Sequence, residues 1–245
     1  MTQYTGLAGA YDRLIGPEIP QKYAARLRTL LRRAGICDGL VLDLACGTGA
    51  VTRELALCGY EMIGCDRSPE MLERARRRCA DLAVPPVLIC QDMTQLDLYG
   101  TIRAAVCCLD SINYLTEPGG LEAALRRVSL FLEPGGRFLF DVKSPQLFAR
   151  EGGTVSTYED DGLFSVWQYG VPRRGLAVHQ VDLFEKDGDG YRRSMELHCQ
   201  RAFSLAQLRA ALECAGLRLD KVYRDYTSRL AAAEEGRLLL AAEKR

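Results

Sequence analysis

The sequence lacks the features that mark a secreted, metal-bound or membrane-spanning protein. Its ten cysteines include no CxxC pair, and the first twenty residues have neither the basic start nor the apolar centre of a signal peptide. No apolar run approaches the roughly 20 residues that a membrane-spanning helix needs. These absences predict a soluble protein of a reducing compartment, the cytoplasm, with no bound metal and no membrane partner.

An excess of either charge is also missing, because Lys and Arg number 32 and so do Asp and Glu. A balanced chain has no long-range field that would draw it to nucleic acid, so a nucleic-acid partner is not expected. Two arginine clusters lie near the ends of expected helices, where positive charge complements the helix dipole, and we interpret them as solvated faces rather than an RNA-binding surface. The clusters are Arg26, Arg28, Arg32 and Arg33, and Arg74, Arg76, Arg77 and Arg78.

Short apolar runs alternate with helical segments through the first 142 residues. Continuous apolar strands separated by helices are typical of a parallel sheet that is covered on both faces, so the predicted fold class is α/β. Ser68 can cap a helix that begins at Pro69, and Glu133-Pro134-Gly135-Gly136 is expected to end a helix before the fifth strand. The expected strands are 40–45, 61–66, 87–90, 104–109 and 137–142, and a helix over 18–34 precedes them.

The pattern changes after Gln146. A stretch rich in Val, Tyr, Phe and Thr, with a turn at 187–190, predicts an antiparallel insertion over 150–203. Within it, apolar and polar residues alternate over 191–200, which is the period of a strand with one packed face and one face toward solvent or a ligand. A helix from Ser204, with Gln207 placed for a capping box, and strands over 217–223 and 237–242 follow.

The most informative motif is a buried strand that runs into a glycine turn and a helix, Val41-Leu42-Asp43-Leu44-Ala45-Cys46-Gly47-Thr48-Gly49-Ala50. Glycines there let the backbone approach a ligand closely, and the helix start offers free N–H groups. Asp66 ends the next strand, where a carboxylate can accept two hydrogen bonds from a ribose diol. Each feature alone could be structural, with the glycines in a tight turn and Asp66 capping a helix. Together, at this spacing, they favour a nucleoside pocket at the carboxyl edge of the sheet.

Over residues 4–142 these motifs resemble the class I S-adenosylmethionine-dependent methyltransferases, and among them the small bacterial methyltransferase-domain type. The resemblance implies S-adenosylmethionine as cofactor and a Rossmann-like seven-stranded sheet with helices on both faces and an antiparallel β insertion after the fifth strand. It implies one domain over 1–245, in which 1–146 form the cofactor-binding core, 150–203 the insertion or lid, and 204–245 a helix and strands that complete the sheet. Ala45 replaces the first glycine of the family's three-glycine pattern.

The same resemblance assigns the cofactor contacts. The segment 43–49 is expected to wrap the methionine part, Asp66 to bind the ribose, and the segment 91–93 to recognise the adenine amino group. An N-terminal aromatic is expected to fold over the cofactor, with Tyr11 as the candidate and Tyr4 as a second one. The implied cofactor-binding residues are Tyr4, Tyr11, Asp43, Ala45, Cys46, Gly47, Gly49, Asp66, Arg67, Met71, Gln91, Asp92, Met93 and Leu109.

A nicotinamide-dependent oxidoreductase is the obvious rival, since it also ends its second strand in an acid. Such enzymes space their glycines as GxGxxG, which lets a helix approach the pyrophosphate. Counted from Gly47, the sixth position is Thr52, so the final glycine is missing. Asp92 after the third strand is better explained by adenine recognition, and the oxidoreductase hypothesis is therefore set aside.

The acceptor site is less defined by the sequence. Alignment of two reactants can supply roughly 7–11 kcal/mol, so a soft nucleophile needs no catalytic base, whereas an alcohol, phenol or protonated amine does. His198, on the polar face of its strand, and His179 are the candidate bases, or else structural residues. The segment 110–114 does not match the Asn/Asp-Pro-Pro-Tyr signature of exocyclic base methylation. The candidate substrate residues are Asp110, Asn113, Tyr114, Trp167, Tyr169 and His198.

The predicted function is methyl transfer to a small-molecule acceptor by direct in-line displacement. Two alternatives stay open at this point: an RNA or protein methyltransferase, which calls for an open cleft and salt-dependent binding, and a cofactor-binding regulator without catalysis. Neither the acceptor atom nor the oligomeric state follows from the sequence.

Overall fold

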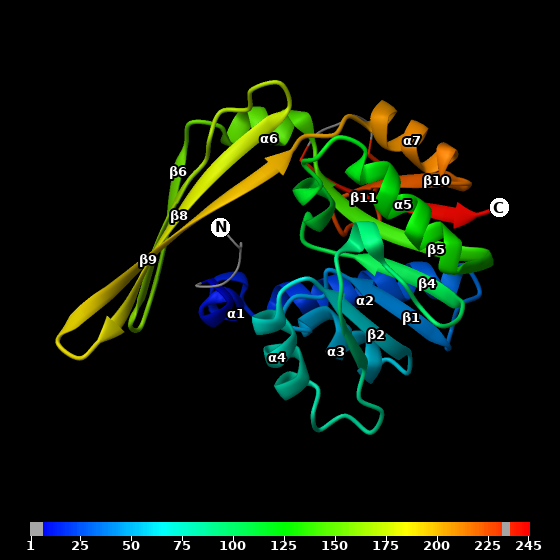
Figure 1. The fold of residues 1–245 in the computed structure, drawn as a ribbon, viewed down its shortest axis with the longest axis horizontal. Helices are drawn as coiled ribbons and strands as arrows, with labels where there is room; N and C mark the ends of the chain where they lie inside the picture. Colours follow the sequence, from blue (N-terminus) through cyan, green and yellow to red (C-terminus); the bar gives the residue numbers. More distant parts are fainter. Residues whose placement is uncertain (1–6, 232–235) are drawn as a thin grey trace.

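The larger of two sheets has seven strands in the order β10-β11-β5-β4-β1-β2-β3 in the computed structural model, which describes residues 7–231 and 236–245 (Figure 1). Strands β1 to β5 pair in parallel, whereas β11 is antiparallel to both β5 and β10. The strands are β1 (Leu40–Leu44), β2 (Glu61–Asp66), β3 (Val87–Cys90), β4 (Ile102–Cys107), β5 (Leu132–Lys143), β10 (Leu217–Arg224) and β11 (Arg237–Lys244).

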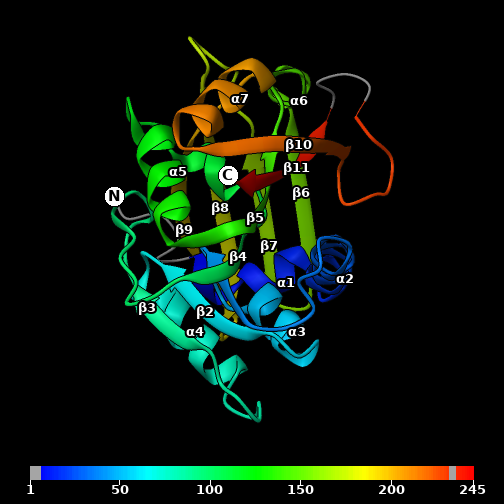
Figure 2. The ribbon, with the colours of Figure 1, turned by 90° about the vertical axis from the view of Figure 1, so that its right-hand side faces the viewer.

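Helices cover both faces of this sheet (Figure 2). Apolar side chains of α2 (Glu18–Arg33) and α3 (Ala50–Leu57) pack on one face, and those of α5 (Gly120–Phe131) and α7 (Leu205–Cys214) pack on the other. Ser68 caps α4 (Pro69–Arg78), and the expected capping box of Ser204 and Gln207 opens α7. The shorter helices are η1 (Leu7–Gly9), α1 (Tyr11–Ile15), η2 (Met93–Gln95), η3 (Ser111–Tyr114) and α6 (Pro145–Glu151).

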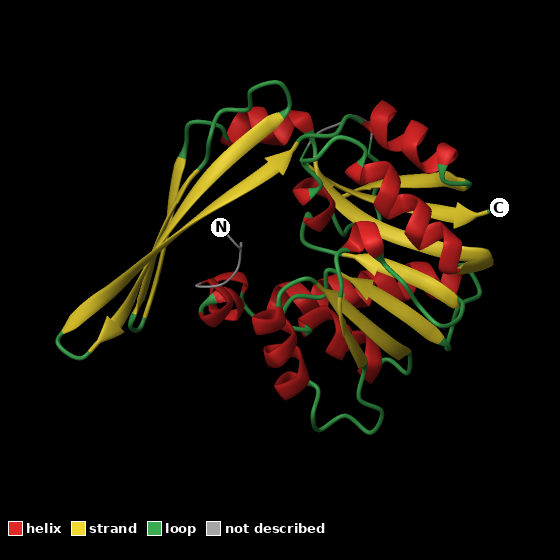
Figure 3. Ribbon diagram, in the orientation of Figure 1, coloured by secondary structure: helices red, strands yellow, loops and turns green. Residues whose placement is uncertain are grey.

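A second, four-stranded antiparallel sheet follows β5 and leans away from the main sheet, with α1 between them (Figures 1 and 3). Residues of η1 and of the turn before α1, Leu7 and Ala10, pack against Leu163, Val181 and Leu183 of this insertion sheet. The seven-stranded α/β fold with an antiparallel insertion is therefore confirmed. The insertion strands are β6 (Val155–Asp160), β7 (Leu163–Gln168), β8 (Leu176–Asp187) and β9 (Gly190–Arg201).

The packed face of β9 is its polar face. Glu196 and His198 are 9% and 1% exposed, whereas Met195 and Leu197 are 44% and 43% exposed. Alternation therefore located the strand, but His198 does not lie toward solvent as a polar face ordinarily does. The buried polar side chains of β9 face η1 and η3, where Glu196 contacts Leu7 and His198 contacts Tyr114.

Two further expectations were wrong in detail. Strand β5 begins at Leu132, so the Pro134-Gly135-Gly136 segment lies within it rather than before it. Arg26 is buried rather than solvated, because its guanidinium lies 4.5 Å above the Tyr223 ring. Among the described residues, no helix has the length and apolarity needed to cross a membrane.

Candidate functional site

A cavity of about 480 Å³ opens at the carboxyl ends of β1, β2 and β3, facing η3 and the start of α5. This edge, where the strand order reverses on either side of β1, is where open α/β sheets bind ligands. The size suits a nucleoside-type ligand. Of the residues predicted from the sequence, the cavity is lined by Tyr11, Ala45, Gly47, Asp66, Arg67, Met71, Gln91, Asp92, Met93 and Tyr114.

The glycine turn after β1 approaches the cavity in left-handed backbone geometry. Gly47 has φ +55°, and a Cβ built on it meets no atom within 4 Å, so the turn presents bare backbone to the cavity. Gly49 has φ +73°, and a Cβ there would lie 2.9 Å from Ala75 Cβ of α4. Ala45, at the position of the family's first glycine, adopts φ +60° despite its side chain. The turn keeps its shape without that glycine.

Asp66 at the end of β2 braces this turn. Its Oδ2 accepts a hydrogen bond from the Gly47 N–H at 2.8 Å, and its Oδ1 accepts one from the Ser68 N–H at 2.9 Å. Burial raises the pKa of Asp66, and the two N–H groups oppose that shift. Ser68, not Asp66, is the N-cap of α4, so the helix-capping explanation of Asp66 is wrong. Its carboxylate retains lone pairs for a ligand diol in the cavity.

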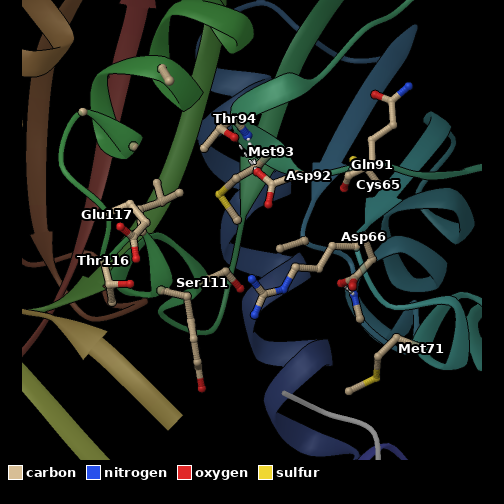
Figure 4. A pocket seen from close by; sticks show the side chains of 18 of the residues that line it. Cys65, Asp66, Met71, Gln91, Asp92, Met93, Thr94, Ser111, Thr116 and Glu117 are labelled. Carbon is tan, nitrogen blue, oxygen red and sulfur yellow. Dashed lines mark hydrogen bonds between the residues drawn. The ribbon is translucent and has the colours of Figure 1, made fainter. Parts of the chain in front are cut away.

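The segment after β3 forms the adjoining wall. Asp92 Oδ1 accepts hydrogen bonds from the Thr94 N–H at 2.8 Å and the Thr94 hydroxyl at 2.6 Å. The Gln91 side chain points away from Asp66 and Asp92 (Figure 4), because its amide pairs with both the N–H and the C=O of Asp97. Gln91 therefore borders the cavity with its backbone, while its side chain holds the loop.

Four residues expected to contact the cofactor are not among the cavity-lining residues: Asp43, Cys46, Gly49 and Leu109. Asp43 is 1% exposed, and its Oδ2 accepts a hydrogen bond from the Thr52 hydroxyl at 2.6 Å. Burial raises the pKa of Asp43 to about 7. Asp43 therefore joins β1 to α3 beneath the turn, and Gly49 permits the close approach of α4.

Helix α1 is fastened to the glycine turn. Asp12 accepts a hydrogen bond from the Thr48 hydroxyl at 2.7 Å and forms an ion pair with Arg78. This places Tyr11 on the wall of the main cavity and of a second hollow of about 300 Å³, which Tyr158, Trp167 and Tyr169 also line. Tyr4 lies outside the described residues.

Two of the substrate candidates are held in structural contacts away from the cavity walls. Asn113 is fully buried; its Oδ1 accepts the Lys143 N–H, and its Nδ2 donates to the carbonyls of Lys143 and Arg201. Asp110 accepts a hydrogen bond from Gln200 at 2.8 Å and pairs with Arg237 at 2.6 Å. Although burial opposes its ionisation, the Arg237 charge keeps the pKa of Asp110 low.

Tyr114 and His198 come together from distant parts of the chain. The Tyr114 hydroxyl lies 3.0 Å from His198 Nδ1, and His198 Nε2 lies 3.2 Å from Glu196 Oε2. The Trp167 ring centroid is 6.3 Å from that of His198. His179, the other histidine, is buried between Phe148 and Tyr169, and burial, with the Lys143 charge, lowers its pKa to about 4. Of the two, His198 is the one joined to the cavity.

The sequence patterns indicated Tyr114 of η3 but not the rest of this wall, which is formed by Ser111 and the start of α5. Ser111 and the segment 115–120 line the cavity opposite Asp66 and Asp92, as Figure 4 shows for Ser111, Thr116 and Glu117. The Pro118-Gly119-Gly120 run was the available signal, because Gly119 has φ +76° and precedes the first turn of α5. The other missed lining residues are Cys65, Thr94 and Ala123.

Comparison with known proteins agrees with this geometry. Residues 41–136 match the methyltransferase domain family. The chain is 32% identical to a Bacillus subtilis (strain 168) protein named as a methyltransferase, YqeM, over 98% of this chain and 97% of that one. It is 29% identical to a dTDP-3-amino-3,4,6-trideoxy-alpha-D-glucopyranose N,N-dimethyltransferase of Streptomyces venezuelae, over 74% and 76%. The structure of an S-adenosylmethionine-dependent methyltransferase from Clostridium acetobutylicum ATCC 824 superposes with a TM-score of 0.88 at 28% identity, covering 99% of each chain.

Proposed function

The chain belongs to the class I S-adenosylmethionine-dependent methyltransferases, and from this premise we propose that it methylates a small-molecule acceptor. The observation that carries the proposal is the pair of hollows that share Tyr11. One is bordered by Asp66 and Asp92, and the other by aromatic rings of the insertion. A hollow of about 300 Å³ with aromatic walls suits a small ligand.

The residues of the main cavity fit the cofactor. Asp66 would accept the ribose hydroxyls, Asp92 the adenine amino group, and the bare backbone of Gly47 would lie against the methionine part, with Met71 and Met93 as apolar walls. When bound, the cofactor supplies a methyl group on a positively charged sulfur, so the protein has mainly to align the acceptor. Tyr11 and Tyr114 would hold the acceptor beside this cavity.

The arginine clusters support a small-molecule acceptor over RNA. Arg26 is buried against Tyr223, and Arg78 is engaged by Asp12. Arg76 and Arg77 are exposed but pair with Glu73 on the same helix. Half of the eight clustered arginines are therefore engaged within the chain, which reduces the positive charge presented to a phosphate backbone. By its name, the Streptomyces venezuelae relative methylates the amino group of a sugar nucleotide, which is a small molecule.

Calorimetric titration with S-adenosylmethionine and S-adenosylhomocysteine tests the cofactor site. We expect micromolar binding to the wild type and a loss of about tenfold or more for Asp66→Ala, because hydrogen bonds to a charged group contribute about 1.5–3 kcal/mol. Glu61→Ala, at the exposed start of the same strand, is the matched control and should bind as the wild type does. Binding of NAD in preference to either adenosyl ligand would sink the proposal.

An acceptor screen tests the substrate class. S-adenosylhomocysteine release is measured with small amines, amino sugar nucleotides and phenols, and in parallel with unmethylated tRNA and ribosomal protein. Turnover confined to small molecules and insensitive to salt is expected. Turnover confined to the macromolecules would refute a small-molecule acceptor, and tight cofactor binding with no turnover on either set would favour the regulator hypothesis.

A further inference from the structure

We propose that Tyr114, His198 and Glu196 form a proton relay that deprotonates the acceptor, which makes the acceptor an N–H or O–H nucleophile. This inference rests on the proposed function and names the chemistry of the same site. The relay starts at the cavity wall and ends inside the insertion. Its three members come from η3 and β9, which are far apart in the sequence.

The three side chains stand in series. The Tyr114 hydroxyl lies 3.0 Å from His198 Nδ1, and the opposite ring nitrogen, Nε2, lies 3.2 Å from Glu196 Oε2. The other carboxylate oxygen, Glu196 Oε1, accepts a hydrogen bond from the Leu7 N–H at 2.8 Å, which fixes the carboxylate. The order is that of a catalytic triad: a hydroxyl that faces the substrate, a histidine that can take its proton, and an acid that orients the histidine.

Burial separates the inner members from bulk water. His198 is 1% exposed and Glu196 is 9% exposed, whereas Tyr114 is only partly buried and lines the main cavity. Tyr114 is therefore the one member of the series that can touch a ligand. Trp167, whose ring lies beside that of His198, also lines the second hollow, so the relay sits where the two hollows approach each other.

The buried polar face of β9 needs an explanation, and the relay provides one. Packing ordinarily buries the apolar residues of an alternating strand, yet here Met195 and Leu197 are exposed and Glu196 and His198 are inside. Burying polar groups costs free energy unless each finds a partner. Strand β9 places Glu196 and His198 on the same inward face, and His198 lies next to Tyr114.

The proton balance of the step is simple. The acceptor N–H or O–H gives its proton to Tyr114 Oη as the Tyr114 hydroxyl passes its own proton to His198 Nδ1. His198 then carries a proton on both ring nitrogens, and the Glu196 carboxylate stabilises the imidazolium. The acceptor gains the methyl group, the cofactor leaves as S-adenosylhomocysteine, and the imidazolium returns its proton to solvent after the products leave. A thiolate acceptor would need none of this.

The direction of transfer requires one tautomer of His198. Tyr114 can hand over its proton only if Nδ1 is unprotonated, which puts the ring proton on Nε2, facing Glu196. With the opposite tautomer Nδ1–H donates to Tyr114, and the relay cannot accept a proton. The tautomer is therefore a readout that can overturn the relay without any acceptor.

Histidine ¹⁵N spectroscopy on the full chain with S-adenosylhomocysteine bound measures the tautomer without any acceptor. The chain has only two histidines, so the spectrum of His179→Gln identifies the His198 signals. We expect unprotonated Nδ1 and protonated Nε2 at neutral pH. Tyr114→Phe should move the Nδ1 resonance, and Glu196→Gln the Nε2 resonance. Tyr191→Phe, at an exposed position on the same strand, is the matched control and should move neither.

The wild-type tautomer decides the question even if a variant does not fold. A protonated Nδ1 in the wild type, or an Nδ1 resonance unchanged in folded Tyr114→Phe, overturns the relay whatever the calorimetry gives. If the wild type binds neither S-adenosylmethionine nor S-adenosylhomocysteine, the proposed function itself is refuted. On the acceptor that the screen identifies, Tyr114→Phe should lower kcat by about 100-fold or more while the Kd for S-adenosylmethionine stays the same. An unchanged kcat also overturns the relay.

Discussion

Arg237 Nη1 lies 2.6 Å from Asp110 Oδ1, which ties the first residue of β11 to the segment that follows β4. The same guanidinium contacts Asp141 of β5, whose carboxylate also accepts a hydrogen bond from Tyr226 at 2.9 Å. Two buried carboxylates therefore share one cation. Burial raises the pKa of Asp141, whereas the arginine keeps that of Asp110 low.

Arg237→Met should lower the free energy of unfolding by about 3–5 kcal/mol, because it leaves two buried carboxylates without their cation. Urea denaturation at neutral pH measures this difference in unfolding free energy between the variant and the wild type. The matched control is Arg218→Met, whose pairs with Asp220 and Glu243 lie at the surface, where solvent screens them, so this variant should lose much less stability. Equal losses in the two variants would contradict the buried network.

Gly49→Ala should destabilise the protein more than Gly188→Ala. Both glycines have positive φ, which costs a non-glycine residue about 1–2 kcal/mol. At Gly188 a Cβ meets nothing within 4 Å, whereas at Gly49 it would lie 2.9 Å from Ala75 Cβ and 3.1 Å from its Cα. This overlap should add about 1–3 kcal/mol, measured as the difference between the two unfolding free energies. Equal losses would mean that α4 simply moves aside.

Asp43 should make the fold less stable as pH rises from about 4 to 7. Burial raises its pKa to about 7 from an ordinary 3.8, so across this window the folded chain keeps a proton that the unfolded chain has released. Below the window both states are protonated. Asp43→Asn removes the effect, so its unfolding free energy relative to the wild type should rise by on the order of 4 kcal/mol across the window.

His179 should act with the opposite sign. Its pKa is lowered to about 4 by burial, so as pH falls from about 6.5 the unfolded chain gains a proton that the folded chain does not bind. Stability is therefore lost toward low pH. His179→Phe should abolish this loss, on the order of 3 kcal/mol between pH 6.5 and 4. Tyr169→Phe, which alters a ring that contacts His179, should retain it. Denaturation curves at each pH provide the comparison with wild type.

Strands and the glycine turn were predictable because their signals are local. A continuous apolar run in 40–45 and the turn at 47–49 specify a strand and a backbone shape with few alternatives. The placement of Asp66 followed from the same rule, since parallel strands end at one edge. Local signals also gave the capping box of Ser204 and Gln207, which the structure confirms.

The orientation of the insertion was not predictable in this way. A strand with alternating residues has two faces, and the elements that lie across from it decide which face is packed. Here those elements are η1, α1 and η3, which are all remote in sequence from β9. The roles of Asn113 and Asp110 also depend on partners that are remote in the sequence. Their position after β4 suggested a role with substrate, but their partners, Lys143, Arg201 and Arg237, come from β5, β9 and β11. Long-range partners decide whether a polar residue contacts ligand or supports structure.

The fastening of Asp12 to Thr48 and Arg78 makes helix α1 and the glycine turn a thermodynamically coupled pair. Whatever orders the turn favours the docked helix, and whatever undocks the helix loosens the turn. Thermodynamic linkage makes this coupling reciprocal. If a substitution shifts the docking equilibrium of α1 by a given factor, cofactor affinity changes by at most that same factor. Two segments 36 residues apart thereby share a single binding free energy.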